Sequence, residues 1–353
     1  MKPLLSTAIC LFLFPIIALS QSSETIRVCT YNLSEFGEGD NDRTDEFRAI
    51  LDEIAPSVLM VQGITSIEAS ALFNNAVLTQ LETPLQGLPL VDPDNDLYMA
   101  IYLDTSKIDF ISAGGWKFEP GPRSLMSVSM RVRATGDTIT TINGHWKDGE
   151  EVDDESARWN AARATKNWMR QMMLTPDEWS SGVNHHILFG GSMNVYGSGD
   201  PSYQMMVARD AERDFHVYDP ISRFGSWYNN EDHADVHTAV DADSGLRARF
   251  DLIMYEATLR EHVVPDTYTT FGNDGEHFNE AINALPNRAV SAAIAQALHD
   301  ASDHLPVYVD FLFQETTSVE SESRPIPHHL ELSGRAMESR TDGSDSNEGV
   351  VGR

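Results

Sequence analysis

The segment His186-Ile187-Leu188-Phe189-Gly190-Gly191-Ser192-Met193-Asn194 constrains the fold more than any other stretch of this chain. Its three consecutive apolar residues are typical of a short buried strand, and the glycine pair ends that strand. Ser192 and Asn194 then follow at the point where the strand would leave a sheet. Because folds place much of their chemistry on the loops at strand ends, we predict a functional site here.

Other parts of the chain are built in the same way. Four more β-rich runs end in polar residues, and one polar triplet precedes the last apolar run. They are Ile26 to Asn32, Val58 to Gln62, Thr138 to His145, Arg249 to Asp251, and Ser302-Asp303-His304 ahead of Val307 to Leu312. Further strands are predicted at Tyr98 to Leu103, Lys107 to Ser112 and Leu125 to Val132.

Helical patterns lie between these strands. Apolar residues recur at helical spacing from Phe47 to Ile54 and from about Ile67 to Leu81. Longer helical patterns cover Asp153 to Met173 and Ala289 to His299, and a short one lies near Tyr203 to Arg209, followed by a long loop to Leu246. The acidic run from Glu150 to Glu155 suits the positive end of a helix dipole better than a metal site. Interleaved strands and helices without a fixed repeat predict an α+β fold.

In their order and spacing, six short segments resemble the endonuclease/exonuclease/phosphatase superfamily, the metal-dependent phosphoesterases that share the pancreatic deoxyribonuclease fold. The segments are Thr30-Tyr31-Asn32, Val61-Gln62, His145-Trp146-Lys147, Gly191-Ser192-Met193-Asn194, Arg249-Phe250-Asp251 and Ser302-Asp303-His304. A secreted bacterial branch also carries segments like Phe271-Gly272-Asn273-Asp274-Gly275. The resemblance implies a four-layer α/β/β/α sandwich, with two packed mixed β-sheets flanked by helices.

The resemblance also implies a role for each matching residue. Asn32 and Asp303 correspond to ligands of Mg²⁺ or Mn²⁺, and His145 and Asn194 to groups that bond the phosphate or assist the leaving group. Asp251 and His304 correspond to a catalytic carboxylate and histidine pair. Each residue also has a structural interpretation: Asn32 as a turn former, His145 as a partner of a loop carbonyl, and Asp251 with His304 as a structural ion pair.

Two positions depart from the family pattern. Gly63 stands where the superfamily has a metal-binding Glu, and Ser192 stands where it has the Asp that orients the attacking water. Magnesium relies on one or two carboxylates plus substrate phosphates, so the two losses predict weak or absent activity. Replacement ligands could come from a loop with Glu35, Glu38 and Asp40, or from Asp274 and Glu276; the acid and histidine cluster from 232 to 237 is expected to be a polar surface loop.

Basic residues around the predicted site suggest a second way of binding phosphate. The secreted branch tends to have acidic residues before Asp251, whereas this chain has Arg247-Ala248-Arg249. Together with Arg123, Lys147 and Arg158, these arginines predict an anion site that needs no metal, with Arg123, Lys147 and Arg249 on the phosphate. A negatively charged cavity would contradict this hypothesis.

Composition restricts the environment and the partners of the chain. Of its 353 residues, 54 are acidic and 25 basic, a net charge of −29 that argues against long nucleic acid as a partner. Lys2, the apolar run from Leu4 to Ala18 and the small residues before Gln21 are typical of a signal peptide over residues 1–20. The run is shorter than the about 20 residues of a membrane span. We therefore expect a secreted, periplasmic or cell-surface protein.

The mature chain is expected to be one domain, residues 21–313, followed by a disordered tail, residues 314–353, rich in Ser, Glu, Asp and Gly. Two function classes stay open. The first is a monomeric, metal-dependent phosphodiester hydrolase acting on a phosphate-containing substrate with Mg²⁺ or Mn²⁺. The second is a non-catalytic descendant without a cofactor that binds a phosphorylated ligand or a surface partner. A purely structural extracellular module is a weaker third.

Overall fold

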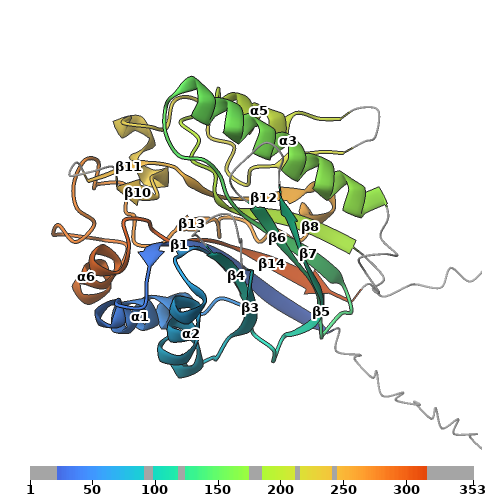
Figure 1. The fold of residues 1–353 in the computed structure, drawn as a ribbon, viewed down its shortest axis with the longest axis horizontal. Helices are drawn as coiled ribbons and strands as arrows, with labels where there is room; N and C mark the ends of the chain where they lie inside the picture. The colour runs from blue at the N-terminus through green and yellow to red at the C-terminus, as the bar shows by residue number, and fades with distance from the viewer. Residues whose placement is uncertain are drawn as a thin grey trace, which may run out of the picture. The chain divides into compact units, whose positions relative to one another are not determined.

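The structure is a computed structural model that describes residues 22–90, 98–117, 124–174, 185–210, 215–240 and 245–315 (Figure 1). All of these residues belong to one compact unit, Met1–Glu315. The predicted signal peptide, the tail beyond residue 315 and Arg123 lie outside the described residues. The domain boundaries proposed from the sequence therefore stay predictions.

The first sheet contains six strands in the order β13-β14-β1-β2-β4-β3. Their bounds are Thr269–Thr270 (β13), Val307–Gln314 (β14), Ser23–Phe36 (β1), Val58–Ile64 (β2), Tyr98–Leu103 (β4) and Gln86–Leu90 (β3). β1 runs antiparallel to β14 and parallel to β2, so the sheet is mixed. Asn32 and Gln62 are paired in the β1–β2 register, which places two of the sequence motifs side by side.

The second sheet contains six strands in the order β5-β6-β7-β8-β12-β9. Their bounds are Ile108–Lys117 (β5), Ser124–Val132 (β6), Thr138–His145 (β7), His185–Ser192 (β8), Asp251–Glu256 (β12) and Val217–Tyr218 (β9). β7 and β8 are parallel, whereas β8 and β12 are antiparallel. In this register Ser192 is paired with His145 on one side and Asp251 on the other, so the ends of three strands meet in one row.

Three apolar cores hold the sheets and helices together as four layers (Figure 1). One core lies between the sheets and joins residues such as Val28 and Met60 to Val128 and Ile253. A second packs the first sheet against helices α1 (Thr44–Ile54), α2 (Ile67–Ala76) and α6 (Ala292–Ala301). The third packs the second sheet against α3 (Val152–Leu174) and α5 (Pro201–Val207). The predicted α+β sandwich of two mixed sheets flanked by helices is confirmed.

The segment between α5 and β12 was predicted as a long loop, and this prediction is wrong. It contains β9, a 3-10 helix η3 (Glu231–Val236), and the two-stranded sheet of β10 (Ala239–Val240) and β11 (Leu246–Ala248). These elements are too short for hydrophobic periodicity to reveal them. No helix in the described ranges is both long and apolar enough to cross a membrane.

Candidate functional site

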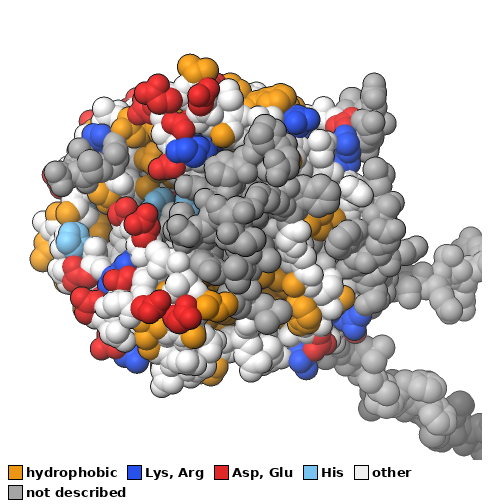
Figure 2. Space-filling model, viewed as in Figure 1, with side chains coloured by type: hydrophobic (Ala, Val, Ile, Leu, Met, Phe, Trp, Pro, Cys, Tyr) orange, Lys and Arg blue, Asp and Glu red, His pale blue; other side chains and the backbone are white. Residues whose placement is uncertain are grey.

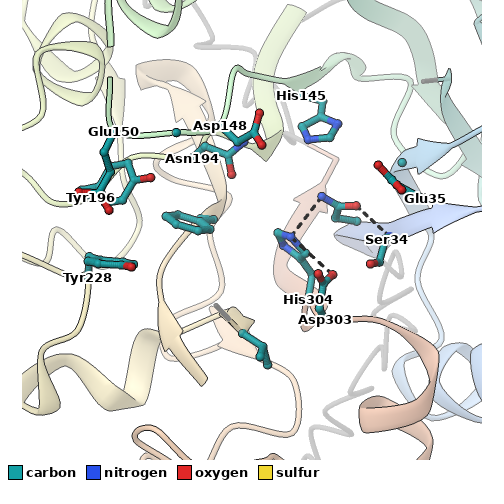
Figure 3. A pocket seen from close by; sticks show the side chains of 15 residues that line it. Ser34, Glu35, His145, Asp148, Glu150, Asn194, Tyr196, Tyr228, Asp303 and His304 are labelled. Atoms are coloured by element: carbon teal, nitrogen blue, oxygen red, sulfur yellow. Dashed lines mark hydrogen bonds and ion pairs between the residues drawn. The ribbon is translucent and has the colours of Figure 1, made fainter. Parts of the chain in front are cut away.

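The ends of the strands that carry the sequence motifs surround one cavity of about 640 Å³ (Figure 3). Five predicted site residues line it: Asn32, His145, Asn194, Asp303 and His304. Gly63 lines it as well. The other lining residues are Ser34, Glu35, Asp148, Gly149, Glu150, Tyr196, Tyr228, Val240 and Phe250. Asp251 and Ser192 lie just behind the wall, fully buried.

A continuous set of hydrogen bonds joins Asn32, Ser192, Asp251 and His304, and we call it the Asn32–His304 chain. The Nδ2 of Asn32 donates to the Oγ of Ser192 at 3.0 Å, and this Oγ donates to the Oδ1 of Asp251 at 2.5 Å. The Oδ2 of Asp251 accepts from the Nδ1 of His304 at 2.7 Å. The Nδ2 of Asn32 also lies 3.4 Å from the Nε2 of His304, which closes the chain into a ring.

Asp251 controls the titration of the histidine in this chain. Burial by itself would lower the pKa of His304, but the charge and hydrogen bond of Asp251, aided by the charge of Asp303, outweigh it and raise the pKa above its usual value. The Oδ1 of Asp303 lies 3.9 Å from the Nε2 of His304. The predicted pairing of Asp251 with His304 is therefore present in the structure.

The two asparagines of the site have orientations set by their backbone partners. The Oδ1 of Asn32 accepts from the backbone N–H of Ser34 at 3.0 Å, so its Nδ2 must face Ser192. The Nδ2 of Asn194 donates to the carbonyl of Trp146 at 2.9 Å, so its Oδ1 is the atom left for the cavity. Asn194 also adopts a left-handed backbone conformation, with φ of 52°. Both amides are therefore fixed by the fold.

Gly63 is required by the backbone next to it. Its φ of +74° favours glycine, and a Cβ at this position would lie 2.6 Å from the Oδ1 of Asn32. The same Cβ would lie 3.2 Å from the backbone nitrogens of Ser34 and Glu35, which themselves have φ of 50° and 51°. The left-handed residues Ser34 and Glu35 thus fill the space that a side chain at position 63 would need.

The donor groups present do not fit the magnesium site that the family resemblance implies. Position 63 has no side chain, Asn32 offers only a neutral amide oxygen, and the hydroxyl of Ser192 donates to Asp251. Within the described ranges, no three His, Cys, Asp or Glu side chains are grouped closely enough to hold a metal ion. Mg²⁺ needs hard oxygen ligands arranged close to octahedral geometry, and these residues do not supply them.

Two of the three residues predicted to bind the phosphate, Arg249 and Lys147, do not line the cavity, which corrects the prediction for them; Arg123 lies outside the described residues. Arg249 is fully buried, and its two terminal nitrogens bind both oxygens of Asp219 at 2.8 and 2.9 Å. Lys147 pairs with Asp148 and Asp154 at 3.2 Å. No Lys or Arg is among the described residues that line the cavity, whereas four carboxylates line it: Glu35, Asp148, Glu150 and Asp303.

Of the replacement acids considered from the sequence, Glu35 alone lines the cavity. Glu38 accepts from Ser66, and Asp40 pairs with Arg43. In the second loop, Asp274 bonds His277 and Glu276 pairs with Arg288. The cluster from 232 to 237 forms η3 and its C-terminal cap, where the Nε2 of His237 bonds the carbonyl of Trp227 at 2.6 Å. His237 is fully buried, so the expected polar surface loop is wrong for this residue.

Sequence reasoning missed several residues of the site. Thr238 donates to the Oδ2 of Asp251 at 2.7 Å and accepts from the backbone N–H groups of Phe250 and Asp251. Thr238 follows η3 in the segment predicted as loop, and no local pattern distinguishes it. Tyr196, Tyr228 and Phe250 form an aromatic wall of the cavity, with ring centroids 5.1 to 6.4 Å apart. Isolated aromatic residues in loops carry no periodic signal, so only the folded chain reveals this wall.

Neither a family model nor a curated protein matches the sequence. Solved structures do match. An endonuclease/exonuclease/phosphatase family protein from Bacteroides thetaiotaomicron covers 83% of this chain and 97% of its own, at 16% identity and a TM-score of 0.56. D. rerio TDP2 complexed with a single strand DNA product covers 81% and 98%, at 16% identity and a TM-score of 0.52.

The human Nocturnin catalytic domain, with a bound sulfate anion, covers 82% of this chain and 97% of its own, at 12% identity and a TM-score of 0.51. At such identities the likeness concerns the arrangement of strands and helices. That arrangement and the order of the strand-end motifs agree with the resemblance inferred from the sequence. This chain has the fold of the endonuclease/exonuclease/phosphatase superfamily.

Proposed function

We propose that this protein is a secreted ligand-binding member of the fold that has lost metal-dependent phosphodiester hydrolysis. One observation carries the proposal: Gly63 and Ser192 stand where the family pattern has the metal-binding and water-orienting carboxylates, and Ser192 is tied into the Asn32–His304 chain as a neutral hydroxyl. Secretion is proposed from the signal-like residues 1–20. The ligand enters the cavity lined by Asn194, Asp303 and His304.

The chemistry of hydrolysis explains why this replacement matters. Phosphodiester hydrolysis needs the phosphate charge to be neutralised and a water to be held for attack, tasks that a divalent metal supplies in this class. Ser192 carries a neutral hydroxyl that donates to Asp251, and such a hydroxyl is not basic enough to take a proton from water as a carboxylate would. The four carboxylates around the cavity repel a phosphate that brings no cation. We therefore expect neither hydrolysis nor tight binding of free phosphate.

A slow hydrolase is the second candidate function, and a specific observation favours it. Asp251, His304, His145, Asn194 and Asp303 all lie at the cavity or directly behind it. Glu35 adds a carboxylate from the strand beside Gly63. In this alternative His304, held by Asp251, protonates the leaving oxygen. D. rerio TDP2 carries a DNA product on the same fold, which makes a short nucleic-acid fragment the natural substrate to try.

An assay of phosphodiester hydrolysis separates the two candidates. The mature chain is incubated with a chromogenic phosphodiester and with a short single-stranded DNA, each with Mg²⁺ or Mn²⁺, beside the variant His304→Ala. We expect both proteins to show the same background rate. Turnover by the natural chain that His304→Ala removes would overturn the proposal and establish the slow hydrolase.

A further inference from the structure

We propose that the cavity binds an aliphatic polyamine, an organic cation with two or more separated ammonium groups. The inference deepens the proposed function, because it names the class of ligand for the same cavity and rests on the cavity being a binding site. Three independent features of the described residues carry it: the charge of the lining, one unpartnered acceptor oxygen of Asn194, and an aromatic wall.

The lining has a strong excess of negative charge. Glu35 and Glu150 have no partner among the described residues, and both are exposed to solvent. Among the described residues, the carboxylate of Asp303 makes the 3.9 Å contact with His304 and no other ion pair, while Asp148 shares Lys147 with Asp154. Glu35 and Glu150 appear on opposite sides of the view in Figure 3, with Asn194 between them. Carboxylates spread in this way suit a ligand with several separated cationic groups better than one metal ion.

Asn194 supplies a fixed acceptor in the middle of this lining. Its side chain is only 4% exposed, and its Nδ2 is held by the carbonyl of Trp146. Its Oδ1 has no hydrogen-bond partner among the described residues and belongs to a side chain that lines the cavity (Figure 3). An acceptor oxygen that the fold holds at the cavity in this way can take a hydrogen bond from an ammonium N–H. A deprotonated phosphate oxygen is itself an acceptor and cannot donate this hydrogen bond.

The aromatic wall of the cavity indicates which kind of spacer lies between the ammonium groups of the ligand. Tyr196, Tyr228 and Phe250 line the same cavity as the carboxylates. Arg158 already lies over the ring of Tyr196, and Arg247 over that of Tyr228, each 5.3 Å from the centroid. Neither arginine lines the cavity, but both reduce the attraction of these rings for another cation. We therefore assign the wall to apolar contact with methylene groups, which an aliphatic polyamine has and a metal ion lacks.

Net charge alone would attract any cation to this protein, so the test must separate the cavity from the rest of the surface. Acidic side chains are spread over the face shown in Figure 2, and the whole chain carries a net charge of −29. At about 0.15 M salt, surface attraction is screened beyond about 8 Å, while contacts inside a cavity persist. Binding is therefore measured at that ionic strength.

The experiment is isothermal titration of the mature chain with spermidine, with the double variant Glu35→Gln/Glu150→Gln beside it. The matched control is Glu53→Gln/Glu261→Gln, which removes the same charge from exposed residues that do not line the cavity. We expect one spermidine site, weakened at least about tenfold in the cavity variant and unchanged in the control. Inorganic phosphate and tetralysine are titrated as comparison ligands.

Each other outcome overturns the inference. Equal weakening in both double variants, or in neither, means that spermidine binds the acidic surface at large. Absence of spermidine binding, or binding of phosphate or of tetralysine alone, means that the ligand belongs to another class. The hydrolysis assay distinguishes the two proposals. Turnover that depends on His304 overturns the proposed function, whether or not spermidine binds. If spermidine does not bind and there is no turnover, only the polyamine is overturned as the ligand class.

Discussion

Asn32 and Gly63 face each other across β1 and β2, and their contact decides which residue position 63 can carry. The Oδ1 of Asn32 occupies the space of a Cβ at Gly63, because it accepts from the backbone of the left-handed Ser34. A carboxylate at position 63 therefore requires the chain from Ser34 to Glu35 to be rebuilt. The loss of the family carboxylate and the shape of this turn belong together.

This contact predicts a large effect for the smallest substitution. Gly63→Ala combines the cost of a left-handed alanine, about 1 kcal/mol, with an overlap that costs about 1–3 kcal/mol more. Gly136 is the matched control, because its φ is +81° but a Cβ there would meet nothing within 4 Å. We expect chemical denaturation to show a loss of about 1 kcal/mol for Gly136→Ala and clearly more for Gly63→Ala. Equal losses would contradict the overlap.

At this scale the sequence reveals the identity of the site residues but not their orientation. The absence of carboxylates at Gly63 and Ser192 can be read directly from the motifs. That Asn194 turns its oxygen to the cavity depends on the carbonyl of Trp146, which is 48 residues away along the chain. Long-range backbone partners of this kind follow from the register of strands, which a local pattern does not contain.

Among the elements, one buried ion pair joins the residue that follows β9 to the segment before β12. Arg249 binds Asp219 through two hydrogen bonds, lies 4.6 Å over the ring of Trp227, and is fully buried. Burial by itself would raise the pKa of Asp219, but the charge and hydrogen bonds of Arg249 lower it. This arginine therefore stabilises the sheet next to the site and is not available to a ligand.

Removing one partner of the pair should be strongly destabilising. Arg249→Met leaves the carboxylate of Asp219 buried without its cation, which costs about 3–5 kcal/mol. Arg48→Met is the comparison, because Arg48 pairs with Asp45 at an exposed surface and such pairs contribute about 0–1 kcal/mol. Both are measured by urea denaturation. The double variant Arg249→Met/Asp219→Asn should recover much of the loss, and no recovery would contradict the account.

Element prediction from the sequence succeeded where periodicity is long. The helix predicted over Asp153 to Met173 is α3, Val152–Leu174, and the strand Tyr98–Leu103 is predicted with its observed bounds. It failed for β9, β10, β11 and β13, each two or three residues long, and for the five-residue edge strand β3. These strands exist because the surrounding fold pairs them, and such tertiary effects leave no local signal. The missed Thr238 lies in this same region.

For the whole molecule, the end of the sandwich away from Ser192 contains a buried histidine that makes stability depend on pH. His186, at the start of β8, is 4% exposed, bonds Thr258 at 2.9 Å and packs 4.7 Å from the ring of His262. Burial first, and then the charges of His262 and His185, lower its pKa to about 4, while the charge of Asp137 acts in the opposite direction.

Since the folded pKa of His186 lies below its unfolded value, the histidine favours folding when neutral. Its contribution is complete above about pH 6.5 and is lost as the pH falls towards 4, a change of about 3 kcal/mol. His186→Asn retains a polar partner for Thr258 but does not titrate. We expect the unfolding free energy of the natural chain to fall more steeply between pH 7 and 4 than that of the variant. Parallel curves would contradict the assignment.

The central claim is that the site, with Gly63 and Ser192 in place of two carboxylates, no longer forms the metal centre of the fold. Titration of the mature chain with Mn²⁺, followed by the electron paramagnetic resonance signal of the free ion, tests it most directly, with Asp303→Asn as the paired variant. We expect only weak binding of Mn²⁺, with a dissociation constant on the order of millimolar that is the same in both proteins. A single Mn²⁺ site with a dissociation constant in the micromolar range, abolished by Asp303→Asn, would contradict this claim.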